Sequence, residues 1–245
     1  MKRCNLPSQD LDCSIGGLTP LTTIDFPDHL ACVIYTQGCP LRCGYCQNTE
    51  LIPLVPGLSV DARWTWTDVV EFLRARQGLL EAVVISGGEP LIQPYLPRMV
   101  KQVKAMGFKV GLHTAGISAA ALSRVIDDLD WVGLDIKAPE EDYARVTGRR
   151  NLWPQVEQCL QLLLQGGGAF ECRTTVDWHY HTVPKLRSLA QYLSQQGVTH
   201  YAVQQNHGTG CLDPKLCQPL LQPVDIIAQL QHQLDSMFTC FTWRT

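Results

Sequence analysis

Three cysteines, Cys39, Cys43 and Cys46, have the residue type and spacing best suited to chemistry in this sequence. They directly follow an apolar run, residues 30–35, that predicts a buried strand. Three thiolates on one short loop can bind three irons of a cubane iron–sulfur cluster, which leaves the fourth iron without a protein ligand. An iron with an open position can bind a reactant. The spacing therefore predicts a reactive cluster in place of a simple electron relay.

Zinc is the main chemical alternative for these cysteines. Cys43 and Cys46 have a suitable spacing for two of the four tetrahedral ligands that zinc prefers. No other Cys or His lies close by in the sequence as a fourth ligand, and Cys32 falls inside the predicted strand. Disulfides are disfavoured because the chain has an odd number of cysteines, 11, and is long enough to fold without them. A cluster is favoured, and a zinc-binding interaction module stays open.

Apolar runs alternate with helical patterns along the chain, which predicts βαβ units and a parallel sheet. Six units are too few for a closed eight-stranded barrel, so we expect an α/β fold with an open, partial (β/α)6 barrel. We expect one domain, with residues 29–245 as its core and residues 1–28 as an N-terminal extension packed on the barrel. The predicted strands are residues 30–35, 82–86, 109–113, 131–136, 170–176 and 200–204, and the predicted helices are residues 69–77, 97–106, 118–128, 141–146, 154–165, 183–196 and 224–237.

Polar groups recur where the predicted strands end, which is where ligands bind in parallel α/β folds. The second strand runs into Gly87, Gly88, Glu89 and Pro90, and glycines let a ligand approach the backbone closely. The later strands end near His113, Asp135 with Lys137, and Arg173. Each group has a plainer interpretation: Glu89 could be a solvated acid, and Asp135 with Lys137 an exposed ion pair that contributes little. Their convergence on one rim favours a ligand site.

The cysteine triplet, with Tyr45 before its last cysteine, and the segment 87–90 together resemble the radical S-adenosylmethionine superfamily. The resemblance implies a [4Fe–4S] cluster whose open iron chelates the amino and carboxylate groups of S-adenosylmethionine. It implies reductive cleavage to methionine and a 5′-deoxyadenosyl radical that removes a hydrogen atom. It also implies that Gly87, Gly88, Glu89 and Pro90 hold the methionine amine, and that Tyr45 lies near the adenine.

A narrower resemblance rests on residues 16–27 and 37–48, which look like the glycyl-radical-enzyme activases. Within these the chain is most similar to the activating protein of anaerobic ribonucleoside-triphosphate reductase. The resemblance implies a glycyl radical enzyme as protein substrate and a flavodoxin- or ferredoxin-type reductant. It implies that Asp135 and Lys137 contact the methionine moiety and that Arg173 meets its carboxylate, with no side chain acting as general acid or base. His113 stands where many activases have an aspartate, and both a ligand contact and a local hydrogen bond are open for it.

Composition excludes some classes of function. The net charge is −3 and the pI about 6.1, so no global basicity indicates nucleic acid or an anionic membrane as partner. Residues 1–10 lack the apolar core of a signal peptide, and no apolar run reaches the roughly 18 residues of a membrane helix. We therefore expect a cytoplasmic protein.

A small-molecule radical enzyme similar to 7-carboxy-7-deazaguanine synthase is the alternative within the superfamily. Cys211 and Cys217 are expected to have no role in a second cluster, and we regard their spacing as incidental.

Overall fold

Eight strands form one sheet whose spatial order follows the chain from β1 to β8. The computed structural model describes residues 13–53 and 64–244. β1 is antiparallel to β2, and every later neighbour is parallel, so the parallel part of the sheet has seven strands, β2 to β8. The strands are β1 (Ile15–Thr22), β2 (Ala31–Thr36), β3 (Ala82–Gly87), β4 (Lys109–Thr114), β5 (Trp131–Asp135), β6 (Phe170–Val176), β7 (His200–Gln205) and β8 (Cys240–Arg244).

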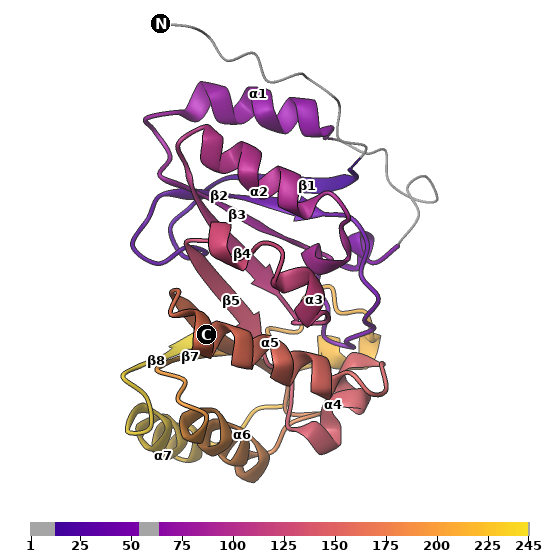
Figure 1. Cartoon of the computed structure of the whole chain (residues 1–245). Coiled ribbons are helices and arrows are strands. Elements are labelled where there is room, and N and C mark those ends of the chain that lie inside the picture. Colours follow the sequence, from indigo (N-terminus) through magenta and orange to yellow (C-terminus); the bar gives the residue numbers. More distant parts are fainter. Residues whose placement is uncertain (1–12, 54–63, 245) are drawn as a thin grey trace, which may run out of the picture.

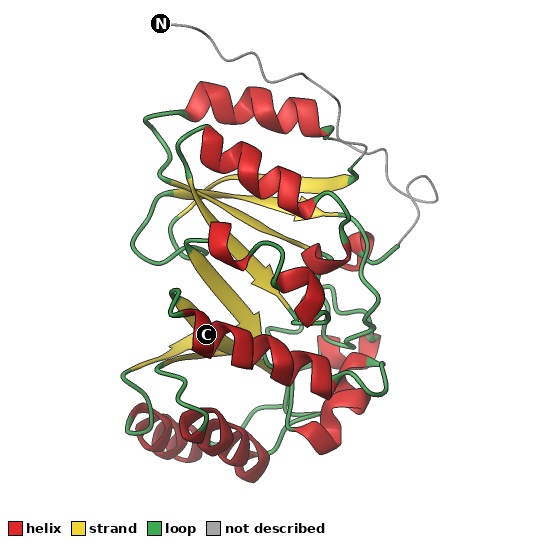
Figure 2. Cartoon of the chain, in the orientation of Figure 1, coloured by secondary structure: helices red, strands yellow, loops and turns green. Residues whose placement is uncertain are grey.

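Helices cover the outer face of the curved sheet, as Figures 1 and 2 show. They bury apolar side chains against the strands in one large core, because each βαβ connection must return across the same face. The helices are α1 (Trp66–Arg76), α2 (Leu96–Ala105), α3 (Ala119–Leu122), α4 (Glu140–Thr147), α5 (Trp153–Gly166), α6 (Val183–Gln195) and α7 (Val224–Asp235), with short 3₁₀ helices η1 (Thr49–Leu51), η2 (Pro90–Ile92), η3 (Ile126–Asp128) and η4 (Pro214–Cys217).

The predicted open, parallel α/β sheet is confirmed, and β1 and β8 lie at its two edges without pairing to each other. The sheet has one more parallel strand than the six predicted, because β8 forms in the apolar run around Cys240, which follows the last predicted helix and was not counted as a strand of the sheet. β1 was not predicted either. Its sequence, Gly-rich with a central proline, lacks the apolar alternation that indicates a strand.

The inner face of the sheet has its own small apolar cluster. Phe26, from the loop after β1, packs on Trp131, with ring centroids 5.8 Å apart. Small residues of β2 and β3 surround the pair and complete this cluster: Ala31, Val33, Ala82 and Val84. The cluster fills the amino-terminal end of the strands. Most of the polar residues singled out in the sequence lie towards the opposite, carboxyl end of the strands.

Two helices differ from their predicted form. α1 begins earlier than expected, since Thr65 is its N-cap and Asp68 completes the capping box three residues on. The predicted helix 118–128 is only α3 followed by η3. Asp127 and Asp128 would lie at the carboxyl end of a continuous helix, where acidic side chains oppose the helix dipole.

Among the described residues, no helix has the length and apolar character that crossing a bilayer requires. Residues 1–10, in which no signal peptide was predicted, lie outside the described part.

Candidate active site

The three cysteines face one cleft at the carboxyl ends of the strands. They lie on the loop that follows β2, where Cys46 N–H donates to Cys43 O at 3.0 Å and tightens the turn between them. The cleft has a volume of about 560 Å³, within the range of small-molecule sites. Of the twelve predicted site residues, only Pro90 does not line it; it is buried at the start of η2.

Burial makes free thiolates unfavourable in this cleft. It raises the pKa of Cys39 to about 11 and also raises the pKa of Cys43, while the nearby Lys137 charge opposes both shifts. Both thiols are therefore protonated at neutral pH unless a cation compensates the negative charge. Metal binding supplies that compensation, because it displaces the thiol protons.

The glycine turn after β3 packs directly against the cysteine loop. A Cβ on Gly88 would lie 2.2 Å from Gly38 O, and one on Gly87 would lie 2.2 Å from Thr36 N. Gly87 also has φ +120°, a conformation that other residues rarely adopt. Two hydrogen bonds, Gly88 N–H to Thr36 O and Glu89 N–H to Gly38 O, each 2.9 Å long, join the same segments. The glycines thus have a packing role between two backbones, beside any ligand contact.

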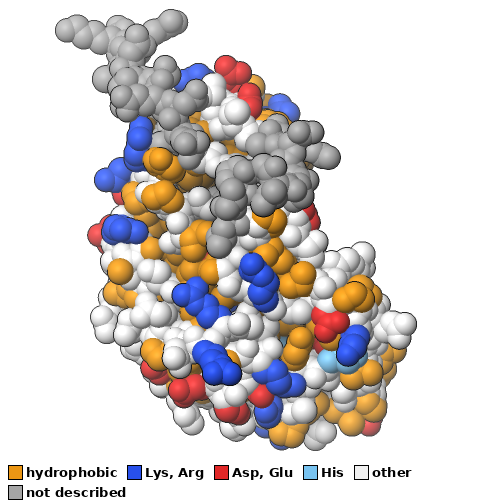
Figure 3. Space-filling model, turned by 90° about the vertical axis from the view of Figure 1, so that its right-hand side faces the viewer, with side chains coloured by type: hydrophobic (Ala, Val, Ile, Leu, Met, Phe, Trp, Pro, Cys, Tyr) orange, Lys and Arg blue, Asp and Glu red, His pale blue; other side chains and the backbone are white. Residues whose placement is uncertain are grey.

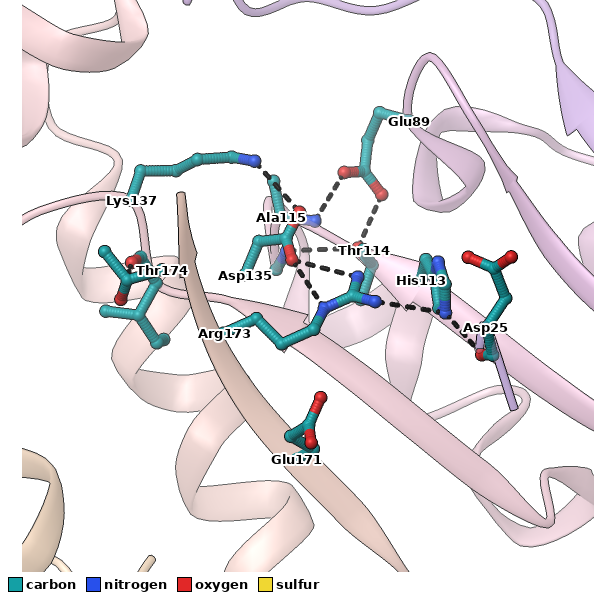
Figure 4. Close-up of polar contacts among 12 residues, drawn as sticks. Asp25, Glu89, His113, Thr114, Ala115, Asp135, Lys137, Glu171, Arg173 and Thr174 are labelled. Atoms are coloured by element: carbon teal, nitrogen blue, oxygen red, sulfur yellow. Dashed lines mark hydrogen bonds and ion pairs between the residues drawn. The ribbon is translucent and has the colours of Figure 1, made fainter. Parts of the chain in front are cut away.

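Glu89 is buried and is satisfied by groups of the chain itself. Its carboxylate accepts hydrogen bonds from Thr114 Oγ1 at 2.6 Å and Ala115 N–H at 2.8 Å (Figure 4), and from Leu91 N–H at 3.0 Å. Burial raises its pKa, and the Thr114 hydrogen bond opposes that shift. The side chain therefore ties the turn after β3 to the end of β4, and the solvated alternative is wrong.

Asp135, Lys137 and Arg173 form a compact charged trio on the wall of the cleft. Lys137 Nζ lies 2.9 Å from Asp135 Oδ2, and Arg173 Nε and Nη2 each lie 2.9 Å from Asp135 Oδ1 (Figure 4). Burial alone would raise the pKa of Asp135, but the charges of Arg173 and then Lys137 hold it well below its usual value. This is a partly buried ion-pair network and not the exposed pair that was the plainer alternative.

Gly133 allows Arg173 to reach this position. A Cβ at residue 133 would lie 2.8 Å from Arg173 Cζ, so the guanidinium lies across β5 only because that strand has a glycine there. The guanidinium continues to His113, whose Nε2 lies 3.1 Å from Arg173 Nη1. The residue types of two neighbouring strands therefore determine together where the cation lies.

His113 is held as a neutral imidazole. Burial lowers its pKa to about 3, and the Arg173 charge adds to the shift. Its Nε2 also lies 2.9 Å from Asp25 O. Arg173 only donates and a carbonyl only accepts, so Nε2 can satisfy one of these neighbours at a time. Local hydrogen bonding is thus in place for His113, and its contact with a ligand stays a prediction.

Tyr45 presents a buried hydroxyl that has no partner among the described residues. Its ring lies edge-on to Tyr180, with centroids 6.2 Å apart, and it lines the cleft. Buried hydroxyl groups normally have a partner, so this one suits a ligand with a polar atom. Three soft thiol donors and this unpaired hydroxyl on one cleft fit an iron–sulfur cluster with a bound organic cofactor.

No group of three or more His, Cys, Asp or Glu within residues 13–53 and 64–244 is arranged to hold a single metal ion. In a cubane cluster each cysteine binds a different iron, so the thiols do not converge on one point.

Further polar residues of the cleft were missed by sequence reasoning. Arg244 Nη2, at the end of β8, lies 2.9 and 3.0 Å from the two carboxylate oxygens of Glu171. Glu171 and Arg173 are two positions apart in β6 and share the inner face, a period-2 signal that was available in the sequence. Gln47 donates to Asn206 Oδ1 at 3.3 Å and joins the cysteine loop to the segment after β7, a contact that no sequence pattern indicated.

Comparison with known proteins identifies the family. A sequence profile described as the radical SAM superfamily matches residues 33–176, more than half of the chain. That span contains the three cysteines, the glycine turn and the charged trio. The chain therefore belongs to the radical SAM superfamily of enzymes, and membership implies a [4Fe–4S] cluster and S-adenosylmethionine.

Curated relatives place the chain near one group within the superfamily. It is 28% identical over 169 residues to MJ1227 of Methanocaldococcus jannaschii, named as a glycyl-radical enzyme activating enzyme, across 66% of this chain and 67% of that protein. It is 30% identical over 137 residues to the pyruvate formate-lyase-activating enzyme of Clostridium pasteurianum, across 55% and 57% of the two chains. The chain thus spans little more than half the length of that activase, and it is homologous to glycyl-radical enzyme activating enzymes.

Solved structures share the fold at low sequence identity. SuiB of Streptococcus suis, in a crystal structure with its precursor peptide SuiA, aligns with a TM-score of 0.65 at 15% identity, over 87% of this chain and 48% of SuiB. QueE of Escherichia coli aligns with a TM-score of 0.57 at 18% identity, over 94% of this chain and 93% of QueE. These likenesses support the partial-barrel fold.

Proposed function

We propose that this chain is a glycyl-radical-enzyme activase. The observation that carries the proposal is the meeting of three cysteine thiols, an unpaired tyrosine hydroxyl and a charged trio on one cleft of about 560 Å³. Homology to activating enzymes supports it. The most specific form of the proposal, that anaerobic ribonucleoside-triphosphate reductase is the partner, is supported by the resemblance of residues 16–27 and 37–48 alone.

In this proposal each part of the cleft has a separate task. Cys39, Cys43 and Cys46 hold the cluster, which together with S-adenosylmethionine supplies a radical able to remove a glycine Cα hydrogen. Lys137 and Arg173 bind a carboxylate, and both are placed to do so because they already bind that of Asp135. Tyr45 offers its hydroxyl to a polar atom of the nucleoside.

The remaining residues position these groups and exclude water. Glu89 fixes the turn that packs on the cysteine loop, and Trp131 packs against His113, with ring centroids 5.4 Å apart. No described side chain has to transfer a proton. The buried neutral His113 keeps its protonation state across the physiological range, which suits a role in positioning Arg173.

The test is anaerobic reconstitution with iron and sulfide, reduction, and EPR before and after addition of S-adenosylmethionine. We expect a [4Fe–4S]⁺ signal that S-adenosylmethionine perturbs and that Cys43→Ala abolishes, with release of 5′-deoxyadenosine. Addition of the anaerobic reductase should then produce a glycyl radical signal on that partner. A cluster that ignores S-adenosylmethionine would contradict the proposal.

Two other outcomes would reassign the protein. Cleavage of S-adenosylmethionine that a small metabolite stimulates, and a partner protein does not, would favour the small-molecule enzyme similar to 7-carboxy-7-deazaguanine synthase. One bound zinc with neither iron nor sulfide after anaerobic purification would favour a zinc-binding module.

A further inference from the structure

Arg244 and Glu171 form an ion pair on the inner face of the sheet, and the proposed function leaves this pair without a task. Arg244 Nη2 lies 2.9 Å and 3.0 Å from the two carboxylate oxygens of Glu171. Charged side chains of both signs are common at the surface, and Figure 3 shows them interspersed over one face of the molecule. This pair differs from them because the Glu171 side chain is only 10% exposed and Arg244 lines the cleft.

The side-chain alternation of β8 turns Arg244 towards the cleft. Phe241 and Trp243 pack on the main core beneath the helices, so the next residue, Arg244, points to the opposite, inner face of the sheet. Glu171 comes from the same strand as Arg173, β6, and lies beside it in Figure 4. The pair therefore belongs to the same wall of the cleft as the charged trio, nearer to the edge strand.

Part of the Arg244 guanidinium is free to bind a ligand. Glu171 engages only its Nη2 atom, and Nε and Nη1 have no hydrogen-bond partner among the described residues. The Arg244 side chain is 33% exposed. A guanidinium presents its N–H donors in a fixed planar arrangement. The bond to Glu171 therefore orients the group and leaves the donors of Nε and Nη1 for another acceptor.

Glu171 also determines what kind of acceptor fits. Its carboxylate already compensates the charge of Arg244, so a second carboxylate would meet a negative charge close by. A neutral carbonyl can accept a hydrogen bond from Arg244 without disturbing the ion pair. The trio of Asp135, Lys137 and Arg173 is different, because it has one more cation than carboxylate and suits an anionic end group.

Gln204 offers the complementary groups for a peptide bond. It is the residue paired with Arg244 in the register of β7 and β8, and it also lines the cleft. Its side-chain amide has both a donor and an acceptor. A peptide group needs a donor for its carbonyl and an acceptor for its N–H, and Arg244 and Gln204 together supply both.

We propose that Arg244, held by Glu171, binds a backbone carbonyl of the protein segment whose glycine gives up its Cα hydrogen. This inference rests on the proposed function. Glycine has no side chain, so the reacting residue itself can be recognised only through backbone groups. The donors of Arg244 face the same cleft of about 560 Å³ as the three cysteines. Arg244 thereby positions the glycine relative to the cluster and takes no part in the hydrogen transfer.

The experiment compares two double substitutions that each remove one acid and one arginine. Glu171→Gln with Arg244→Gln removes the pair and leaves neither of its charges unpaired. Glu71→Gln with Arg74→Gln makes the same change at exposed positions of α1. The probes are the anaerobic ribonucleoside-triphosphate reductase and a synthetic peptide with its glycine segment. Calorimetry on the anaerobically reconstituted protein measures peptide binding, and EPR follows glycyl radical formation on the reductase.

We expect the cleft variant to raise both the Kd of the peptide and the KM for the reductase about tenfold, with kcat changing less than about twofold. This is the effect of losing one hydrogen bond from a charged donor. The α1 variant should change each quantity less than about twofold. S-adenosylmethionine should still perturb the EPR signal of both variants, which shows that fold and cluster are intact.

Ester analogues of the peptide, with one backbone amide replaced at a time, give a readout that a purely structural role would not change. An ester carbonyl accepts hydrogen bonds more weakly than an amide carbonyl. At one position the unaltered protein should bind the ester about tenfold less tightly than the peptide. The cleft variant should lose most of this difference.

Equal effects of the two double variants on peptide binding, or an ester effect that persists unchanged in the cleft variant, would overturn the role of Arg244. Loss of the S-adenosylmethionine effect on the EPR signal in the cleft variant alone would also overturn it and assign the pair to the cofactor. Failure of the unaltered protein to assemble a cluster or to cleave S-adenosylmethionine would contradict the proposed function itself. An unaltered protein and a cleft variant that activate the reductase equally would overturn only the role of Arg244.

Discussion

Asp135 is the only carboxylate that Lys137 and Arg173 contact in the described structure, and all three lie on the wall of the cleft. Removing one partner from such a network leaves charges without compensation in a poorly solvated place. Loss of one partner should therefore lower the stability of the fold as well as the affinity for a ligand.

We expect Asp135→Asn to lower the free energy of unfolding by about 3 kcal/mol, because two largely buried cations lose their counterion. Chemical denaturation followed by circular dichroism measures the change. Asp127→Asn, at an exposed carboxylate with no ion pair in the described structure, is the control and should change stability by less than about 0.5 kcal/mol. Equal effects of the two substitutions would contradict the assigned role of Asp135.

His113 should make stability depend on pH below neutrality. Its pKa is about 3 in the folded protein and about 6.5 when exposed. Between these values the unfolded chain binds the extra proton, so the free energy of unfolding falls as pH is lowered from 6.5 and is unaffected above about 7. His181, whose pKa is also lowered by burial, acts in the same direction.

The measurement is the free energy of unfolding at several pH values between about 5 and 7 for the unaltered protein and for His113→Gln. In the variant, the free energy of unfolding should depend less steeply on pH, by up to about 1.4 kcal/mol per pH unit, because one group that binds a proton on unfolding has been removed. Other groups titrate in both proteins and cancel in the comparison. Parallel slopes would show that the imidazole is not held neutral.

The sequence predicted where the site residues lie better than what they contact. The rule that ligands gather at strand ends brought eleven of twelve candidates onto one cleft. It could not show that Glu89 binds Thr114 and Ala115, because these partners depend on how two strand ends are placed side by side. The contact between Arg173 and His113 depends in the same way on Gly133. This residue has no side chain, so no sequence pattern connected it with the site.

At the scale of elements, the contact between the turn after β3 and the cysteine loop positions the site. Gly88 and Gly38 meet backbone to backbone, and neither segment has a flexible side chain there that could yield. The cysteine loop therefore takes its position from β3 as well as from β2, to which it is covalently joined.

We expect Gly88→Ala to lower the free energy of unfolding by about 1–3 kcal/mol, as overpacking does, because the new Cβ would lie 2.2 Å from Gly38 O. Gly168→Ala is the matched control, since a Cβ there has no neighbour within 4 Å, and its effect should be small or slightly stabilising. Thermal denaturation compares them. An equal loss of stability in both variants would mean that the close approach of Gly88 to Gly38 does not require a glycine at residue 88.

Secondary structure was predictable wherever apolar periodicity was strong. β2 to β7 match their predicted ranges to within one residue at each end, and α2, α4, α5 and α6 match as closely. β1 was missed, and β8 was not counted as a strand of the sheet, because edge strands bury little and need no clear apolar pattern. The start of α1 was predicted at residue 69 and not at Trp66, because Thr65 and Asp68 both have side chains suited to an N-cap and the sequence alone does not decide between them.

On the scale of the whole molecule, the open sheet leaves its polar interior accessible. A ligand that fills the cleft contacts the cysteine loop and strands from β3 to β8 at once. Binding should therefore stabilise the fold as a unit.

With a reconstituted cluster, S-adenosylmethionine at about one hundred times its dissociation constant should add roughly 2.7 kcal/mol and raise Tm by about 5–10 °C for a chain of this size. Anaerobic scanning fluorimetry measures the shift. Cys43→Ala, prepared in the same way, should show a clearly smaller one, because it lacks a cluster ligand. An identical shift in that variant would mean that the ligand binds independently of the cysteines.

The trio of Asp135, Lys137 and Arg173 has a consequence for selectivity. It holds two cations and one carboxylate, so an anion that took both cations away from Asp135 would leave the aspartate without a counterion. A zwitterion that brings an ammonium for Asp135 and a carboxylate for the cations exchanges partners without changing the net charge of the cleft. We therefore expect simple salts such as chloride and acetate to compete poorly, and a ligand with an amino acid end group to bind better.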